Sequence, residues 1–294
     1  MQRDQSFVQR SLWVLSCCKL SFLSFLTGSG PTEIFVTTSK LVITTVYATT
    51  IVCGLAGNGL GLYLALRKRL GNRAANTLIA NMAVADLLVT TFAMPYTIIY
   101  IHVGLQWLGG VIGQVTCKIV HFSYQVSIPA SIFTVLLVSF DRFYAICYPM
   151  RGNVFRNVKV ITALIWISSS GYAIPFKMAN DIHEHNGVHY CLRVFSPFDK
   201  QKSRKIYYLT TFILLYCVPL VILTVLYTLI SRKLWQRQIP GNVSKARFRS
   251  AEKEKRRIIK ALILIVVVFA ICWLPAHVMH YLSNRSRVDR KSVV

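Results

Sequence analysis

The chain has 294 residues, of which 54% are hydrophobic and only 15% are charged, and its mean hydropathy is +0.50. A soluble domain of this size rarely has such a composition, so we expect an integral membrane protein. The formal net charge of +24 would suit a nucleic acid, but the basic residues lie between apolar runs rather than on a soluble module, which argues against nucleic-acid binding.

Residues 1–40 precede the first long apolar run, and we interpret them as an extracellular N-terminal segment. Within them, Leu12 to Leu26 is apolar and follows Arg3 and Arg10, as in a signal peptide, yet Lys19 interrupts it. A cleaved signal peptide and a plain extracellular tail therefore both stay open.

Six apolar runs are long enough to cross a hydrocarbon core of about 30 Å as helices. They cover residues 41–66, 77–101, 117–142, 160–176, 206–230 and 258–282. Pro219 and Pro275 lie within the last two runs and predict kinks there. The pattern indicates an all-α membrane bundle over residues 41–282, followed by a short polar tail at 283–294.

Charge in the loops predicts the orientation of these spans. Basic residues gather at 67–73 and 232–260, whereas the loop at 102–116 has none. Since Lys and Arg are retained on the cytosolic side, the N-terminus should be extracellular. Basic residues at 200–205 and 285–291 oppose this pattern, but the long loop at 232–260 outweighs them.

Short motifs follow one another along the spans in a fixed order. They are Gly57-Asn58, LIANMAVADLL with Asp86, Cys117, DRF with Arg142, Trp166, Cys191, Pro219 with Tyr227 beyond it, and FAICWLP with Phe269, Trp273 and Pro275. This ordered set resembles the rhodopsin-like, class A family of G protein-coupled receptors. The resemblance implies a seven-transmembrane receptor bundle of which six helices are present, in the plasma membrane.

The family's seventh helix has no counterpart in the sequence, because residues 283–294 contain no apolar run. They stand in place of the third extracellular loop and the seventh helix. An incomplete or alternatively spliced chain and a truncated receptor that does not signal are both compatible with this pattern.

The resemblance assigns activation and coupling to one set of residues. Asp141 and Arg142 would form an ion pair that breaks when Arg142 reaches into a heterotrimeric G protein, where Tyr227 helps hold it. A solvated helix end is the structural alternative for this pair. The residues expected to repack on activation are Ile132, Pro219 and Phe269, with Trp273 and Pro275 beside them.

Asp86 lies in the middle of the second span, where an ionised carboxylate is costly and needs partners. Asn58 and Ser131 are the expected partners. The resemblance implies that this polar core binds a sodium ion, and the alternative is a hydrogen-bonded structural aspartic acid.

Cys117 and Cys191 would, by resemblance, form a disulfide between the third span and the second extracellular loop. The flanking sequence VHYCLRVF contains strand-forming residues, so a hairpin over the outer end is expected.

The family's ligand-binding positions are aromatic and polar in this chain, which suits a peptide. They are Tyr96, Tyr100, His121, Tyr124, Gln125, Tyr208, Trp273, His277 and His280. Amine receptors carry an Asp at the position of Tyr124, so a biogenic amine is not expected. The second-span sequence ADLLVTTFAMPY and Trp107 in the first outer loop also resemble the corresponding segments of neuropeptide receptors. The histidines of the second outer loop and the sixth span suit hydrogen bonding better than metal binding.

An enzyme is not expected, because the sequence shows no nucleophile with a matching base and no phosphate-binding loop. A transporter is the rival from a different class, since Asp86 could belong to an ion path, but no internal repeat is visible. We therefore expect the partners to be an extracellular peptide, a heterotrimeric G protein and membrane lipids.

Overall fold

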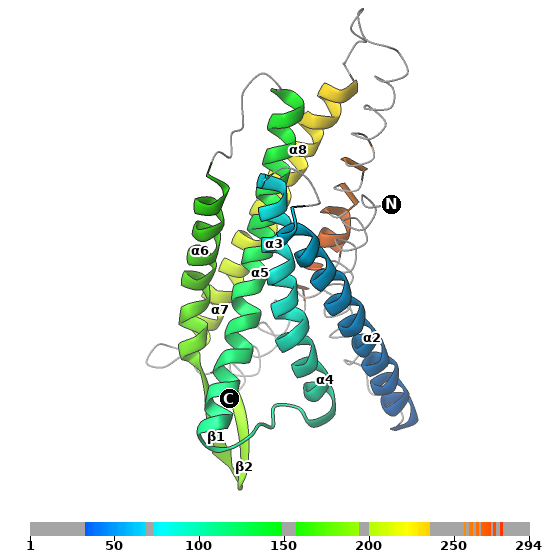
Figure 1. Ribbon diagram of the computed structural model, residues 1–294. Helices are drawn as coiled ribbons and strands as arrows, with labels where there is room; N and C mark the ends of the chain where they lie inside the picture. The colour runs from blue at the N-terminus through cyan, green and yellow to red at the C-terminus, as the bar shows by residue number, and fades with distance from the viewer. Residues whose placement is uncertain are drawn as a thin grey trace, which may run out of the picture.

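A computed structural model of the chain describes residues 33–68, 73–148, 157–193 and 200–235. In the last part of the chain it describes residues 256, 259, 260, 263, 264, 266–271, 273, 274, 277 and 278, all of them helical. Among the residues described, five helices are long and apolar enough to cross a membrane. They lie side by side as a bundle, with the last helical segment beside α8 (Figure 1).

The helices follow the apolar runs of the sequence closely. Three spans are single helices: the first is α2 (Glu33–Leu66), the third is α5 (Gly110–Cys147) and the fourth is α6 (Val158–Ala179). The second span consists of α3 (Arg73–Leu88), the π-helical turn η1 (Val89–Ala93) and α4 (Met94–Val103). The fifth span consists of α7 (Lys200–Phe212), the π-helical turn η2 (Ile213–Cys217) and α8 (Val218–Trp235). The first five predicted spans are therefore confirmed. The third is longer than predicted, since α5 begins at Gly110 rather than Cys117 and continues to Cys147 rather than Arg142.

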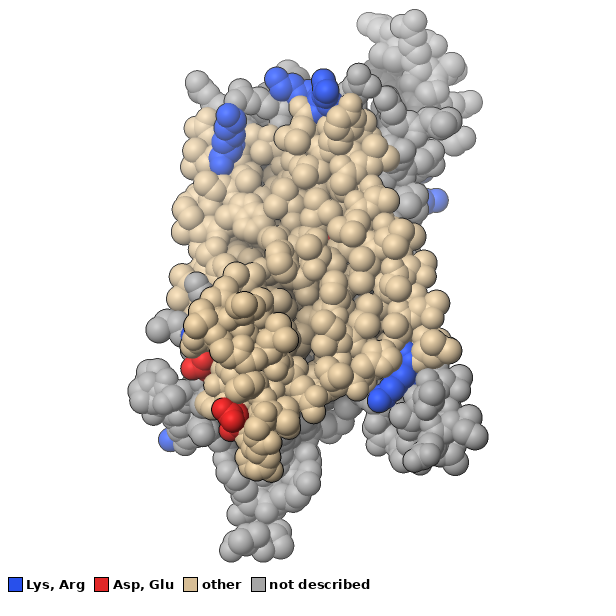
Figure 2. All heavy atoms as spheres, turned by 60° about the horizontal axis from the view of Figure 1, so that its bottom comes forward, with Lys and Arg blue, Asp and Glu red and all other residues tan. Residues whose placement is uncertain are grey.

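The outer faces of the helices carry the side chains that a hydrocarbon environment requires. Val52, Leu164 and Val221 are all more than half exposed in the isolated chain. Figure 2 shows the side of the bundle as a largely uncharged surface, with charged side chains near its two ends. Because water would penalise so much exposed apolar area, this belt is where lipid covers the protein.

Two spans contain a π-helical turn immediately before a proline. The turn η1 precedes Pro95, the second residue of α4, and the turn η2 precedes Pro219, the second residue of α8. Proline has no N–H to donate, and its ring collides with the carbonyl one turn earlier. A wider i→i+5 turn accommodates that carbonyl without ending the helix. At Pro219, where the sequence predicts a kink, the structure has the π-helical turn η2 just before the proline.

A chain of side-chain hydrogen bonds joins three spans in the middle of the bundle. The indole N–H of Trp166 on α6 donates to Asn81 Oδ1 on α3, and Asn81 Nδ2 donates to Thr134 Oγ1 on α5. Thr134 in turn donates to the carbonyl of Ala130 at 2.6 Å. Since Asn81 and Thr134 are buried, these bonds fix how α3, α5 and α6 lie against one another.

The predicted hairpin is present after α6. Strands β1 (Asn180–His185) and β2 (Val188–Arg193) are antiparallel and are connected by Asn186 and Gly187. Both turn residues have positive φ angles, 52° and 75°. Asn-Gly is the sequence that best tolerates such a two-residue turn. The hairpin stands at the outer end of α5 (Figure 1).

We predict that Gly113→Ala destabilises the protein, whereas Gly171→Ala does not. A Cβ at Gly113 would lie 1.8 Å from the backbone oxygen of Leu108, while a Cβ at Gly171 meets nothing within 4 Å. Overpacking against rigid backbone costs about 1–3 kcal/mol, and a helical Gly→Ala change in open space gains about 0.5–1 kcal/mol. Thermal unfolding of the two variants in detergent checks this. An unchanged unfolding temperature for Gly113→Ala would contradict the close approach.

Candidate functional site

Three aromatic side chains meet at the outer end of the bundle. The Tyr96 ring on α4 lies 5.4 Å from the Trp107 ring and 5.0 Å from the His121 ring on α5, both edge-on. Trp107 is held by its indole N–H, which lies 3.0 Å from both Gly113 O and Thr116 Oγ1. His121 Nδ1 lies 2.9 Å from the carbonyl of Cys117. That nitrogen therefore carries the proton, and Nε2 is the acceptor.

Hydrogen-bonded polar side chains from α5, α6, α7 and β2 lie at the same end of the bundle as these three rings. Gln125 Nε2 on α5 donates to Tyr207 Oη on α7 at 2.7 Å. The hydroxyls of Tyr172 on α6 and Thr211 on α7 are 2.6 Å apart. The guanidinium of Arg193, on β2, lies 5.4 Å from the centre of the Tyr207 ring. We call Tyr96, His121, Gln125, Tyr207 and Arg193 the outer cluster.

The sequence identified only part of this cluster. Tyr96, His121 and Gln125 were expected, whereas Tyr207, which contacts Gln125, was not; the sequence pointed instead to its neighbour Tyr208 as a ligand-binding residue. Arg193 was not identified, although its place two residues after Cys191 was a usable signal. Tyr100 lies farther out, 48% exposed, with its ring 6.3 Å from that of Tyr96.

The sixth span contributes a row of rings on one helix face. Phe269, Trp273 and His277 follow at intervals of four residues, and consecutive rings are 6.1 Å and 5.9 Å apart. Tyr216, in η2, lies 5.0 Å from the His277 ring and donates its hydroxyl hydrogen to Ala270 O at 2.9 Å. Tyr216 was not expected from the sequence. Pro275 and His280 lie outside the described residues.

One continuous apolar core runs from these rings to the opposite end of the bundle. It contains Ile132 and Phe269 among its buried residues and extends inward to Tyr227 and Ile230. Tyr124 packs against this core and also against a second one formed by α2, η1 and α4. Pro219 is fully buried on α8. The residues expected to repack on activation therefore lie between the outer cluster and the inner end.

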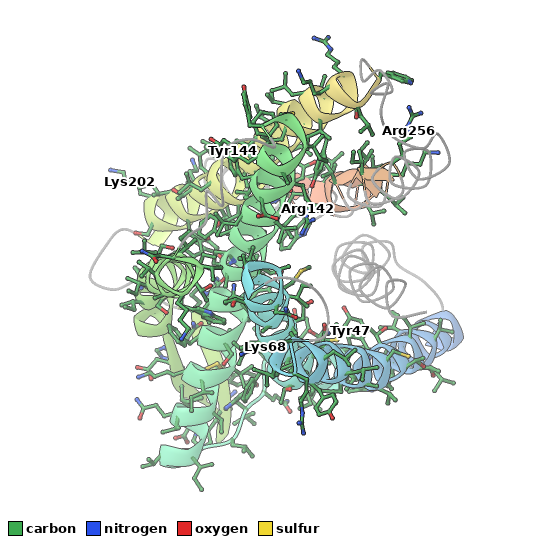
Figure 3. The ribbon with its side chains drawn as sticks, turned by 45° about the horizontal axis from the view of Figure 1, so that its top comes forward. Tyr47, Lys68, Arg142, Tyr144, Lys202 and Arg256 are labelled. Carbon is green, nitrogen blue, oxygen red and sulfur yellow. A yellow bond between two sulfur atoms is a disulfide. The ribbon has the colours of Figure 1, made fainter. Side chains whose placement is uncertain are left out.

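The inner end of α5 carries the expected charged pair. Arg142 Nη2 lies 3.3 Å from Asp141 Oδ2, with 34% and 17% of the two side chains exposed. Figure 3 shows Arg142 extending from α5 toward the interior of the bundle. The hydroxyl of Tyr227, on α8, is hydrogen-bonded to Ser139, one turn before Arg142. Arg142 and Tyr227 each have a partner on α5 in this structure.

Asp86 lies near the end of α3, inside the second span, and is buried with 2% of its surface exposed. The Ser131 hydroxyl lies close enough to act on this carboxylate. However, neither Asp86 oxygen nor Ser131 Oγ makes a hydrogen bond to any described residue. Ser131 is thus a neighbour of Asp86, as expected, but does not reach it with hydrogen-bond geometry, and Asn58 is also buried. The Asp86 carboxylate and the Ser131 hydroxyl are buried oxygen groups that receive no hydrogen bond from described residues, and such oxygens could hold a hard cation.

The hairpin is fixed over the outer end by covalent and hydrogen bonds. Cys117 and Cys191 form the expected disulfide. The Cys191 N–H donates to Leu105 O at 3.1 Å, and the Trp107 N–H donates to His189 O at 2.8 Å. The sulfurs of Cys117 and Cys191 lie near His121, but paired in a disulfide they are not thiolate ligands for a metal.

A second contact holds the hairpin through Asp181. Its Oδ1 accepts hydrogen bonds from Gln114 Nε2 at 3.2 Å and the Ile182 N–H at 3.0 Å, and lies 3.9 Å from Lys118 Nζ. Partial burial raises the pKa of this carboxyl. The hydrogen bonds and the charges of Lys118 and His183 outweigh burial, so the pKa lies below its ordinary value.

The family of the chain is decided by its sequence match together with this fold. Residues 57–292 match the model of the 7 transmembrane receptor (rhodopsin family). The chain belongs to this family. The family consists of receptors, which confirms both the expected class and the prediction that the chain is not an enzyme.

Similar receptors are found in several animals. The chain is 31% identical to Galanin receptor 2b of Danio rerio over 246 residues, covering 82% of this chain and 62% of that receptor. It is 27% identical to the QRFP-like peptide receptor of Branchiostoma floridae, with 86% and 68% covered. It is 28% identical to the Tachykinin-like peptides receptor 86C of Drosophila melanogaster, with 81% and 48% covered. The chain thus spans about half to two thirds of these relatives.

We predict that Asp181 stabilises the hairpin above about pH 4 and that this contribution is lost as the pH falls through its lowered pKa. The carboxylate attracts Lys118 only when it is ionised, and its hydrogen bonds to Gln114 and Ile182 are then stronger because they are charge-assisted. Asp181→Asn should therefore unfold at a lower temperature than the unchanged protein at neutral pH, by a difference that shrinks in acid. Thermal unfolding between about pH 6 and pH 3 checks this, and a difference independent of pH would refute it. The effect should be small, because 49% of the side chain is exposed.

Proposed function

We propose that the chain is a plasma-membrane receptor with an extracellular N-terminus that binds a peptide and activates a heterotrimeric G protein. The observation that carries the proposal is one apolar core that runs from Tyr124, next to Gln125 of the outer cluster, and Trp273 to Ile146 at Arg142's end of α5. The relatives are named for peptide ligands, galanin, QRFP-like and tachykinin-like. Aromatic and hydrogen-bonding side chains of the outer cluster suit such ligands.

A peptide bound at the outer cluster would contact the rings that begin the core. His277 and Trp273 pack on Phe269, and Phe269 shares the core with Ile132 and Tyr227. Because a close-packed core is bistable rather than continuously deformable, a small displacement of these rings favours a second helix arrangement. That arrangement would separate Arg142 from Asp141 and Tyr227 from Ser139, which frees both for the G protein.

We also propose that Asp86 and Ser131 bind a sodium ion in the resting state. A buried carboxylate and a buried hydroxyl, without hydrogen bonds to described residues, are oxygen ligands for a hard cation. An ion that binds only this arrangement stabilises it by mass action. The sodium site rests on these two residues and is independent of which peptide binds outside.

We predict that Arg142→Ala retains peptide binding and loses peptide-evoked nucleotide exchange. Charge-assisted hydrogen bonds are worth about 1.5–3 kcal/mol, so exchange should fall by about tenfold or more. The measurement is GTP-analogue uptake by purified G proteins with the receptor in lipid nanodiscs, using galanin, QRFP-like and tachykinin-like peptides.

Lys68→Asn is the matched control, because it removes a positive charge from the exposed inner end of α2 (Figure 3). Lys68 has a φ of 55°, which Asn tolerates. Exchange should be unaffected in this control. Evoked exchange that persists in Arg142→Ala would overturn the coupling role. Peptide binding without exchange in the unchanged chain would instead favour a receptor form that does not signal.

We predict that sodium raises the unfolding temperature of the unchanged protein and not that of Asp86→Asn. Above the dissociation constant, each tenfold rise in sodium adds about 1.4 kcal/mol to the free energy of unfolding. Choline replaces sodium at constant ionic strength as the control. An equal response to both cations would argue against a specific site.

A further inference from the structure

The hairpin belongs to a larger arrangement in which β2 is the central strand. β1 pairs with one edge of β2 over its whole length. The connection between α4 and α5, which Figure 1 shows beside the hairpin, adds to the other edge, because Gln106 forms an antiparallel bridge with Tyr190. Both edges of β2 are thus occupied, whereas within the described residues nothing pairs with the outer edge of β1.

Two backbone hydrogen bonds determine which way the residues of the hairpin point. The Trp107 N–H donates to His189 O at 2.8 Å, and the Cys191 N–H donates to the same connection at 3.1 Å. In an antiparallel pair, the N–H and C=O of one residue point to the same side, and successive residues alternate. His189 and Cys191 therefore point away from β1. Their register partners, Glu184 and Ile182, point away from β2.

The outer edge of β1 carries backbone groups that are available for pairing. The Ile182 N–H donates to Asp181 Oδ1 at 3.0 Å. The Ile182 C=O and both backbone groups of Glu184 are not bonded to any residue that the structure describes. Glu184 is also exposed. Outward N–H and C=O groups on an edge strand are a template for a further strand.

The chemistry of this edge favours a short extended peptide over a second copy of the chain. Two β1 edges paired about a twofold axis would set Glu184 opposite Glu184, where like charges repel, or Glu184 opposite Ile182. In the second case the Ile182 N–H is already used by Asp181. A peptide has neither restriction, since its residue opposite Glu184 is free to be basic.

The same edge leads to the outer cluster. Asn180, at the start of β1, is 1% exposed, and its Oδ1 accepts a hydrogen bond from Arg193 Nε at 3.4 Å. Glu184 lies four residues farther along β1, which is about 13 Å in a strand. An extended segment of about four residues therefore connects a ligand at the outer cluster with the exposed part of β1.

We propose that the outer edge of β1 binds an extended segment of the peptide ligand as an added antiparallel strand. The ligand residue opposite Glu184 exchanges two backbone hydrogen bonds with it, and the residue two positions later donates to Ile182 O. A Lys or Arg opposite Glu184 would lie on the same face as its carboxylate, which is 63% exposed. The proposal rests on the proposed function, since it presumes a peptide at this end of the receptor.

A capped tetrapeptide, acetyl-Thr-Lys-Thr-Val amide, tests the pairing on the full chain in nanodiscs. Its lysine is designed to lie opposite Glu184, and its other residues are strand formers. Two further probes carry one backbone N-methyl group, either on the lysine, whose N–H would face β1, or on the following threonine, whose N–H would face away. We expect methylation at the lysine to weaken binding about tenfold and methylation at the threonine to leave it unchanged. Saturation-transfer NMR measures the affinities, with empty nanodiscs as the blank.

Variants at Glu184 assign the effect to the edge of β1. Glu184→Pro removes the outward N–H, and an edge strand tolerates this proline because that N–H takes no part in the β1–β2 ladder. The unmodified probe should then bind about tenfold more weakly. Glu184→Ala is the matched control, because it removes the side chain and keeps the backbone, and the difference between the two methylated probes should persist in it. Unfolding temperatures are measured for both variants, and the probe comparison on the unchanged protein decides the matter if Glu184→Pro does not fold.

Several results would overturn the proposal. They are equal affinity of the two methylated probes, no saturation transfer to the unmodified probe, and full affinity of a folded Glu184→Pro variant. Self-association that is lost in Glu184→Pro, measured by light scattering, would assign the edge to a second copy instead. Each of these results leaves the proposed receptor function intact if the longer peptides still evoke nucleotide exchange. Strand pairing without exchange evoked by any longer peptide would support the edge site and contradict the proposed signalling.

Discussion

Polar groups inside the hydrocarbon layer must be satisfied by the protein itself, and the rest of this structure follows from that constraint. Helices satisfy the backbone, and threonine hydroxyls within the spans bond back to carbonyls one turn earlier, as Thr90 does to Asp86 O at 2.7 Å. Where Pro95 and Pro219 remove a donor, π-helical turns precede them. Polar side chains that remain are joined in chains, such as Trp166–Asn81–Thr134. Asp86 and Ser131 are among the buried polar side chains that make no hydrogen bond to a described residue, and Asp86 is therefore a candidate for ion binding.

The end of the bundle with the hairpin, which we propose to be extracellular, is stabilised by a disulfide and a loop structure instead. The bond between Cys117 and Cys191 closes a loop with a sequence separation of 74, for which stabilisation of about 2–4 kcal/mol is typical. Its structural effect is to fix the face of the hairpin that carries Arg193. Backbone bonds from β2 to Leu105 and from Trp107 to His189 add rigidity. The register of the hairpin places Asp181 on one face and Arg193 on the opposite face.

The two ends are connected by packing rather than by polar contacts. Aromatic rings of η2 and the sixth span continue into an aliphatic core that reaches Tyr227. The π-helical turn η2 places Tyr216 where it bonds to Ala270 O and touches His277. A local deviation caused by Pro219 thus helps position the contact between the fifth and sixth spans. In the structure, Asp141 and Ser139 are bonded to Arg142 and Tyr227, the two side chains that the proposed signalling state would release.

The sequence by itself determined the helical class, the first five spans and the hairpin, because hydrophobic length and strand-forming residues are local properties. The ordered motifs also sufficed to identify the family and to expect the Cys117–Cys191 bond. The missing hydrogen bonds of Asp86 could not be predicted, since they depend on distances between spans. The contact of Tyr207 with Gln125 could not be predicted for a similar reason, because the π-helical turn η2 changes which residues of the fifth span share a face. Only the tertiary structure brought Arg193, from a strand, over Tyr207, from a helix, because the two residues belong to elements whose relative position no local pattern determines.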